Sequence, residues 1–188
     1  MTRLIFRIVL TSLTLAALLV SCSSKPSLQS YFLESQDKPG FYTQSIPKGI
    51  LGIDENDLTG DAKTAYNSIE KVNVLFYPNN DKNKANFSKE SAKVNAILQN
   101  EDYKMLVSHS DDNTKMRMVY DGTQDAIDEI IMYGTSDDMG MGVARIMGDD
   151  MQLGSILKLM NEMDKSSVDG TMLQNIMKNF SGKMKEMH

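Results

Sequence analysis

The chain has 188 residues, of which 20 are basic and 25 are acidic, so its formal net charge at pH 7 is −5. That acidic balance argues against nucleic-acid binding, which depends on clustered positive charge. With one cysteine and two histidines, the chain is poorly equipped for a histidine-based metalloenzyme or a cysteine nucleophile, and it cannot form an internal disulfide bond.

The first 21 residues have the organisation of a secretory signal. Arg3 and Arg7 precede a short apolar run over residues 8–20, and the small residue Ser21 comes just before Cys22. The apolar run is shorter than the roughly 20 residues that a membrane-spanning helix requires. We therefore expect residues 1–21 to be a lipoprotein signal peptide that is removed.

Leu19-Val20-Ser21-Cys22 resembles the lipobox of bacterial lipoproteins. This resemblance implies cleavage before Cys22 and acylation of that residue. Each buried methylene adds roughly 0.8 kcal/mol of membrane affinity, so two or three acyl chains make a stable anchor. No aspartate follows Cys22, which by the same resemblance favours the outer membrane and its periplasmic face. An ordinary signal with a chance cysteine and an uncleaved anchor are the alternatives.

The rest of the chain divides into three parts. Residues 22–30 are polar and are expected to form a flexible tether. Residues 31–180 are long enough for one domain with its own core, and residues 181–188 are expected to be a frayed tail. Without residues 1–21, the chain has a net charge of −7, which argues against binding to anionic lipid through charge.

Hydrophobic periodicity and turn residues predict the elements of the domain. Thr59 is expected to cap the first clear helix, and Ser88 the second. In chain order, the expected elements are two short extended pieces within 31–53, a helix over 60–69, a strand over 72–77, a helix over 88–100, strands over 103–109, 115–120, 127–133 and 140–147, and helices after Asp149-Asp150 and after Gly170.

This order predicts a two-layer α+β fold, with an antiparallel or mixed sheet of about five strands and helices packed on one face. Because a helix separates strands 72–77 and 103–109, these two strands are expected to pair in parallel through a crossover connection. The later strands are joined by short turns and are expected to form hairpins.

Methionine is the outlier of the composition, since 14 of the 15 methionines lie at or after Met105. Thioethers bind Cu(I), so copper binding is a possible role. Methionine also fills irregular cores, and most of these residues share a face with Val, Ile or Leu, which favours a core role. The pairs considered are Met116 with Met118, Met139 with Met141 and Met160 with Met163; the terminal cluster of Met184, Met187 and His188 is the remaining metal candidate.

We expect no catalytic residues and no cofactor. Serine-hydrolase and phosphate-loop motifs are missing from the sequence. His109 stands near a strand end and is interpreted as structural, with a base or ligand role as the alternative. The pairs Asp111-Asp112, Asp137-Asp138 and Asp149-Asp150 coincide with turns or a helix cap, where aspartate is common, although such pairs can also bind calcium or act in acid–base catalysis.

Arg145 stands among apolar residues on a predicted strand. A strand arginine in that setting is expected to pair with an acid, and Glu129 on the neighbouring strand is the suggested partner. A ligand carboxylate or phosphate is the alternative partner, which makes Arg145 the candidate binding residue.

Several short segments resemble one family. They are the lipobox, Ser27-Leu28-Gln29-Ser30-Tyr31, Pro39-Gly40-Phe41, Ile97-Leu98 with Tyr103 and Leu106, and above all Arg145-Ile-Met-Gly-Asp-Asp-Met151. The chain is thereby similar to the Bacteroidetes small lipoprotein family catalogued as domain of unknown function 4252. The resemblance implies an exported lipoprotein and carries over no functional residues. In the motif that carries the resemblance, Gly148 is expected to make the turn between a strand and a helix, and the aspartates that follow are expected to cap that helix.

The sequence thus predicts a non-catalytic outer-membrane lipoprotein that acts as a scaffold or binding module through an unidentified envelope protein partner. A methionine-rich copper(I)-binding periplasmic lipoprotein is the alternative.

Overall fold

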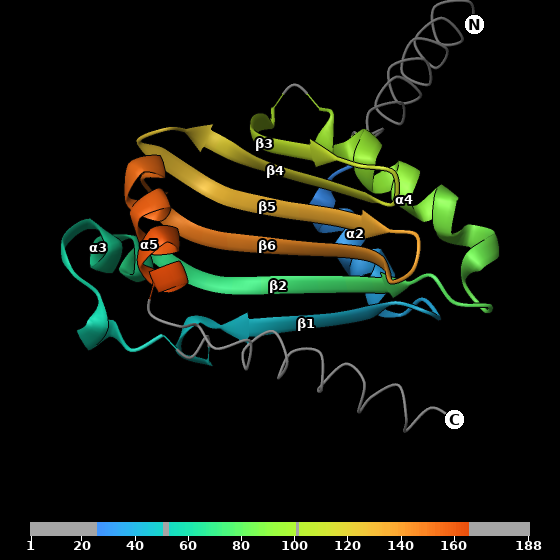
Figure 1. Cartoon of the computed structure of the whole chain (residues 1–188), viewed down its shortest axis with the longest axis horizontal. Helices are drawn as coiled ribbons and strands as arrows, with labels where there is room; N and C mark the ends of the chain where they lie inside the picture. The colour runs from blue at the N-terminus through green and yellow to red at the C-terminus, as the bar shows by residue number, and fades with distance from the viewer. Residues whose placement is uncertain (1–25, 51–52, 101, 166–188) are drawn as a thin grey trace, which may run out of the picture.

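The centre of the molecule is a six-stranded sheet in the order β1-β2-β6-β5-β4-β3, with every neighbouring pair antiparallel (Figure 1). This computed structural model describes residues 26–50, 53–100 and 102–165. The strands are β1 (Tyr42–Pro47), β2 (Ile69–Pro78), β3 (Lys104–Ser110), β4 (Thr114–Thr123), β5 (Ala126–Ser136) and β6 (Gly140–Met151).

Four α-helices and two 3-10 turns complete the described part of the chain. Among these described residues, no helix is both long enough and apolar enough to cross a membrane. The α+β class is confirmed, with six strands where about five were expected, because residues 42–47 add an edge strand. The helices are α2 (Leu28–Gln36), α3 (Gly60–Ser68), α4 (Lys84–Leu98) and α5 (Leu153–Lys165), and the 3-10 turns are η1 (Lys48–Ile50) and η2 (Glu55–Asp57).

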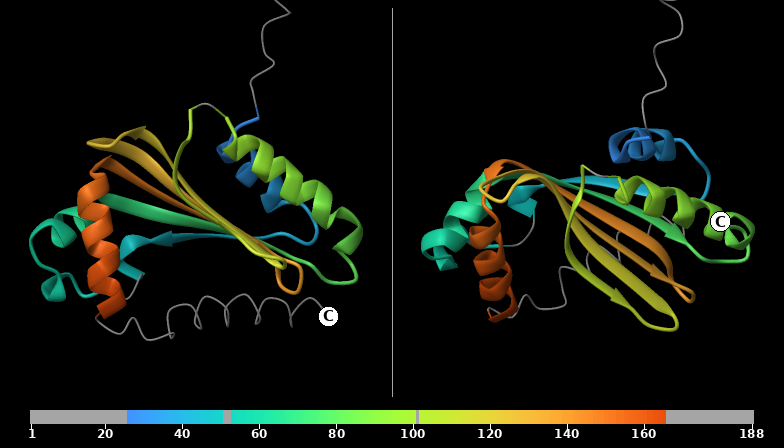
Figure 2. Two further views of the ribbon diagram at one scale, coloured as in Figure 1. Left: turned by 45° about the horizontal axis from the view of Figure 1, so that its top comes forward. Right: turned by 90° about the horizontal axis from the view of Figure 1, so that it is seen from above.

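The first core lies under α2 and α4, which cover the same face of the sheet (Figure 2). Successive strand residues point to opposite faces, so alternate residues of each strand enter this core. Leu28 and Val94 reach it from the helices, and both side chains are completely buried. The strands contribute Leu75, Tyr77, Val119, Ile131, Tyr133, Met141 and Val143.

A second core lies on the opposite face, at one end of the sheet, under α3 and α5. Ile127, Ile130 and Met151 are its most deeply buried strand residues, with 1 % exposure or less. We expected the helices on one face, but the structure divides them between two. The reason is that β4, β5 and β6 carry apolar side chains at both odd and even positions, so each face has apolar area to bury.

The strands 72–77 and 103–109 were expected to be parallel neighbours. In the structure β2 pairs with β1 and β6, and β3 pairs with β4 among the described strands. The alternating directions make β2 and β3 run the same way, but three strands separate them. The pairing prediction is wrong because β6, which comes much later in the chain, occupies the position beside β2.

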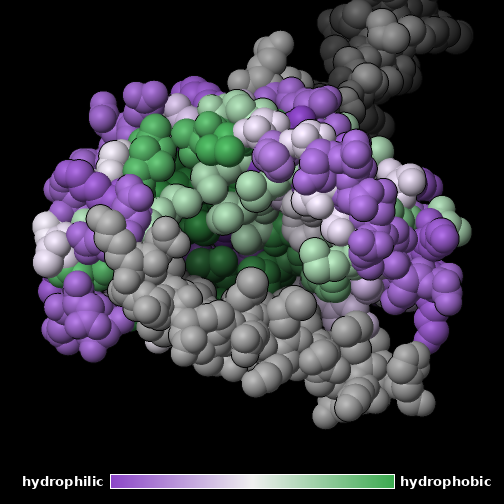
Figure 3. Space-filling model, in the orientation of Figure 1, coloured by the Kyte–Doolittle hydropathy of each residue, from purple (hydrophilic) through white to green (hydrophobic). Residues whose placement is uncertain are grey.

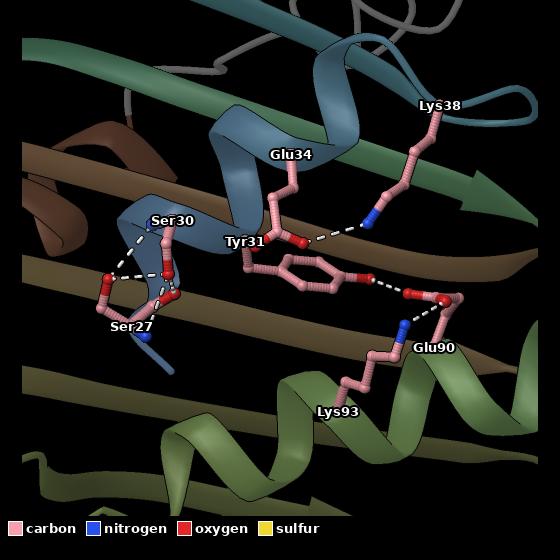
Figure 4. A network of polar contacts seen from close by, with 7 residues as sticks. All are labelled: Ser27, Ser30, Tyr31, Glu34, Lys38, Glu90 and Lys93. Carbon is pink, nitrogen blue, oxygen red and sulfur yellow. Dashed lines mark hydrogen bonds and ion pairs between the residues drawn. The ribbon is translucent and has the colours of Figure 1, made fainter. Parts of the chain in front are cut away.

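One helix lies where none was predicted, in place of the first extended piece expected within 31–53, and another begins earlier than predicted. The tether expected over residues 22–30 gives way to α2 at Leu28, where Ser27 and Ser30 form a reciprocal capping box (Figure 4). The apolar contact of Leu28 with the core stabilises this early start. The α4 helix begins at Lys84 after Asn83, rather than after Ser88, so one further turn precedes the predicted cap.

The segment after Arg145 was expected to leave the sheet at Gly148. Instead β6 continues to Met151, whose side chain is completely buried and which pairs with Ile127. A Cβ on Gly148 would lie 2.2 Å from the Ser68 carbonyl oxygen, so glycine is required for close strand contact and not for a turn. Asp149 and Asp150 are exposed strand residues rather than helix caps.

Candidate binding site

Arg145 forms an ion pair with Glu129, as the sequence suggested. Its Nε donates to Glu129 Oε2, and Tyr103 Oη donates to Glu129 Oε1 at 2.9 Å. Arg145 and Glu129 are 9 % and 6 % exposed, so both charges are buried with their partner. The pair belongs to the neighbouring strands β6 and β5, which fixes it within the sheet.

Burial, together with the charge of Glu129, raises the pKa of Tyr103 well above its usual value. The hydroxyl therefore remains protonated at neutral pH and continues to donate to the carboxylate. Each oxygen of Glu129 thus accepts one hydrogen bond. This cluster pairs the charge of Arg145 within the sheet and stabilises the fold.

Arg117 on β4 is the second arginine on this face of the sheet, because it lies beside Tyr133, a residue of the first core. On its other side, Ser108 of β3 is the register partner. Its Nη1 atom is buried and makes no hydrogen bond, and no carboxylate of the described residues lies within 4.0 Å of it. Arg117 is therefore a half-buried cation whose shielded Nη1 atom lacks the kind of partner that Arg145 has.

A cavity of about 580 Å³ adjoins Arg117, between α4 and the ends of strands β3 to β5. The α4 residues from Phe87 to Asn95 contribute one wall. Tyr133 is buried and donates from its hydroxyl to the Ser91 backbone carbonyl at 3.3 Å, which ties the two walls together. Polar groups on the walls include Ser88, Ser91, Asn95, Ser108 and Thr135.

The rim of the cavity carries both signs of charge. Lys115, Asp112 and Asp137 are exposed lining residues. His109, also exposed and lining, has its Nε2 at 3.6 Å from Asp111 Oδ2. The sequence placed His109 at a strand end without a partner, whereas the structure pairs it with Asp111 across the beginning of the β3–β4 turn.

The aspartate pairs have the turn roles expected for two of the three. Asp111 accepts hydrogen bonds from the backbone N–H groups of Asn113 and Thr114, at 3.0 and 2.7 Å. These bonds hold the pKa of the Asp111 carboxyl below its usual value. Asp137-Asp138 lies in the β5–β6 turn. Within residues 26–50, 53–100 and 102–165, no cluster of three His, Cys, Asp or Glu side chains has the arrangement of a metal site.

The methionines fall into two groups. Met141 and Met151 are completely buried, which agrees with a core role. Met116, Met118 and Met132 lie on the sheet face opposite α2 and α4, with Met118 directly opposite Met132. Met116 and Met132 are 45 % and 37 % exposed. Figure 3 shows apolar surface gathered on this face, which we call the methionine face.

The remaining methionine candidates do not form pairs in the described part of the chain. Met139 is exposed in the turn before β6, and Met141 is buried within that strand, so the two do not share a surface. Met160 is exposed on α5, and the side chain of Met163 is outside the described set. Cys22, Met184, Met187, His188 and the helix expected after Gly170 also lie outside the described residues.

The helices α2 and α4 are joined by a polar contact at the side of the first core (Figure 4). Tyr31 Oη donates to Glu90 Oε2 at 3.0 Å, and Lys93 Nζ lies 2.6 Å from Glu90 Oε1. Burial, reinforced by the charge of Glu90, raises the pKa of Tyr31 far above its usual value, so the phenol remains a donor. This contact fixes α4, and therefore the helical wall of the cavity, against the sheet.

The fold and the cavity define a small α+β domain with an open antiparallel sheet and a polar pocket between α4 and the ends of strands β3 to β5. Residues 31–159 match the family model described as Domain of unknown function (DUF4252), so the chain belongs to that family. The matched region includes both arginines and every residue of the cavity. No curated protein and no solved structure shows a significant match to the chain.

Arg117 is the residue of this site that sequence reasoning missed. The predicted strand 115–120 alternates, and its odd positions place Arg117 two residues from Val119, which is buried. An arginine in phase with a core residue is the same signal that singled out Arg145. That Arg117 has no acidic neighbour could be recognised only once the order of the strands in the sheet was known.

Proposed function

We propose that this protein is a lipid-anchored, non-catalytic binding module of the bacterial cell envelope, held at the periplasmic face of the outer membrane and acting through a protein partner. The observation that carries the proposal is Leu19-Val20-Ser21-Cys22, which follows a signal-like segment. A lipid on Cys22 would anchor the chain at a point only six residues before Leu28, the start of α2.

That spacing limits where the domain acts. Even fully extended, six residues span at most about 20 Å. The domain would therefore remain beside the bilayer, with the N-terminus of α2 nearest the anchor. A partner that recognises the domain must accordingly be reached at the membrane surface.

A non-catalytic role is supported by how the buried ionic groups are used. Glu129 accepts from both Arg145 and Tyr103, so this carboxylate is engaged in structure. Glu90 is likewise engaged by Tyr31 and Lys93. Groups with such partners are poorly placed to exchange protons with a substrate.

Mass spectrometry of the natively expressed protein tests the anchor. We expect a chain that begins at Cys22 and carries acyl groups, and Cys22→Ala is expected to abolish fatty-acid labelling and membrane fractionation. Ser23→Ala, a change of similar size one residue further along, is expected to leave both unchanged. An unmodified Cys22 thiol, or an uncleaved leader, contradicts the proposal.

Cross-linking of the anchored protein in its own cells tests the protein partner. The expected result is a discrete adduct that forms with the whole chain. The control is a fusion of residues 1–27 to an unrelated domain, which has the same anchor and tether. Adducts that are identical for the fusion and the whole chain would show that the domain itself recognises no partner.

Copper(I) binding is a second candidate, favoured by the methionine face. Side chains directly opposite on antiparallel strands have Cβ atoms about 4.5–5.5 Å apart, so Met118 and Met132 can bring two thioethers to one ion. Met116, two residues from Met118, can supply a third. Thioether sulfur is a preferred ligand of Cu(I).

Titration of the protein with Cu(I) decides this candidate. Binding tighter than micromolar is expected if the face holds copper, and Met132→Leu is expected to weaken it at least tenfold. Met139→Leu is the matched control, because Met139 is an exposed methionine in the turn before β6. Affinity no tighter than micromolar, or equal losses in the two variants, removes copper from consideration.

A further inference from the structure

Burial of a guanidinium group costs free energy. Removing a cation from water is unfavourable unless hydrogen bonds and an opposite charge replace the lost hydration. Arg145 satisfies this requirement through Glu129. For Arg117, the buried Nη1 atom has no acceptor, and none of the described carboxylates is within ion-pairing distance.

The position of Arg117 does not require an arginine for packing. Its neighbours in the sheet are Ser108 and Tyr133, and the row continues to Val143 on β6. An apolar side chain of similar length could extend from this row under α4. The charge therefore needs a reason other than the core.

The cavity beside Arg117 provides the space for a ligand. Its volume of about 580 Å³ lies within the roughly 300–1,000 Å³ range of small-molecule sites. The planar guanidinium presents paired donors that match the oxygens of a carboxylate or phosphate. Hydroxyl and amide groups of Ser88, Asn95 and Thr135 line the same space and can bind the remaining polar atoms.

We infer that this cavity binds a small polar solute through an anionic group, a carboxylate or a phosphate, that pairs with Arg117. The site goes beyond the protein-partner role proposed above, since it takes a soluble ligand and requires no anchor. Asp112 and Asp137 lie at the rim, where they favour a ligand that carries its anionic group on one end only. The recognised group thus enters toward Arg117, away from the rim acids.

Thermal unfolding of the full chain in detergent tests this inference with three probes: inorganic phosphate, propionate and propionamide. A ligand that binds the native state raises the unfolding temperature in a saturable manner. We expect phosphate, propionate or both to do so at constant ionic strength, and propionamide, which has the same shape as propionate without its charge, to have no effect. Which anion acts tells phosphate from carboxylate recognition.

The matched variants are Arg117→Met and Lys71→Met. Arg117→Met is expected to raise the anion concentration for half-maximal stabilisation at least about tenfold, because it removes a hydrogen-bonding charge. Lys71→Met removes an exposed charge on β2, away from the cavity, and is expected to leave that concentration unchanged. No saturable response to either anion, an equal response to propionamide, or an unchanged response in Arg117→Met overturns the inference.

Two-dimensional NMR of the same samples keeps the test informative if a variant unfolds. The expected anion-induced shifts in the wild-type chain lie at the backbone amides of Ser91, Ser108 and Thr135. Shifts confined to residues outside the cavity would equally overturn the inference. The anchor experiments do not depend on this outcome, because Cys22 plays no part in it.

Discussion

Arg145 and Arg117 lie on the same face of one sheet, two strands apart in the order β6-β5-β4. Each lines a cavity, but only Arg145 has an acidic partner among the described residues. Glu129 on β5 is within reach of Arg145, and Tyr103 completes the cluster. Arg117 has Tyr133 as its neighbour on β5 and a polar cavity beside it. The charge of Arg145 is paired within the fold, whereas Arg117 has a buried nitrogen without a hydrogen bond.

A charged side chain can be retained in a protein interior for two reasons, structure and binding. A buried pair such as Arg145–Glu129 is costly to break, since each partner leaves an uncompensated charge behind. A half-buried cation with a buried, unbonded nitrogen, such as Arg117, lowers stability in the absence of a ligand, and stability is commonly sacrificed at binding sites. Stability measurements on the two arginines should therefore give opposite results.

The largest effect is expected for Arg145→Met. This change leaves Glu129 buried without its cation and should lower the free energy of unfolding by about 3–5 kcal/mol. Urea unfolding followed by circular dichroism measures it. In the double variant Arg145→Met/Glu129→Gln, the charge is gone and Tyr103 keeps an acceptor, so much of the loss should be recovered. A loss below about 1 kcal/mol in the single variant would mean that the pair is not buried in solution.

Tyr103→Phe should have an intermediate effect on the same cluster. It removes a hydrogen bond to a charged acceptor, worth about 1.5–3 kcal/mol. Tyr66→Phe is the matched control, because Tyr66 Oη donates to the neutral Lys48 carbonyl at 3.3 Å. That loss should be smaller, about 0.5–1.5 kcal/mol. Equal losses in the two variants would show that the charge of Glu129 contributes little.

Arg117→Met should have the opposite sign. It removes a buried, unbonded donor and adds apolar surface, so the free energy of unfolding should stay unchanged or rise by up to about 1 kcal/mol. The measurement is the same urea titration, without added anion. A loss of more than about 1 kcal/mol would show that Arg117 stabilises the fold, and the two arginines would then belong to one class.

The smallest effect is expected for Asp111, in the β3–β4 turn that borders the cavity. Backbone N–H groups of Thr114 and Asn113 lower the pKa of its carboxyl in the folded state. A lowered folded-state pKa contributes stability above the unfolded pKa, about 3.9, and that contribution is lost as the pH falls through the folded value. Asp111→Asn should therefore lower the unfolding temperature slightly at pH 6 and not at all at pH 2.5. An unchanged difference at both pH values contradicts this assignment.

The parts of the fold that local sequence determines were predictable. Alternation and turn residues gave the strands 115–120, 127–133 and 140–147 close to their positions, and Arg145 with Glu129 followed from two adjacent strands. The pairing of strands that are distant in the sequence could not be predicted from such local patterns. The position of β6 beside β2 depends on how the two faces bury their apolar residues, and the extension of β6 to Met151 depends on the second core.

The candidate site could be predicted only in part from the sequence, because its residues come from segments that are distant in the chain. Its α4 wall and its β4 arginine are 22 residues or more apart, counted from Asn95 to Arg117. No local sequence pattern predicts that the α4 wall and Arg117 face each other. The sequence does show that Arg117 and Val119 share one face of a strand. That Arg117 lacks an acidic partner depends on which residues the adjacent strands place beside it.

The division of apolar residues between two faces also determines how the molecule comes apart. Strands β2, β4, β5 and β6 each contribute buried side chains to both the first and the second core. Opening one face would disturb the strands that support the other. We therefore expect a single cooperative melting transition, in which amide protons of Ile130 and Ile131, neighbours that point to opposite cores, exchange with solvent at the same slow rate.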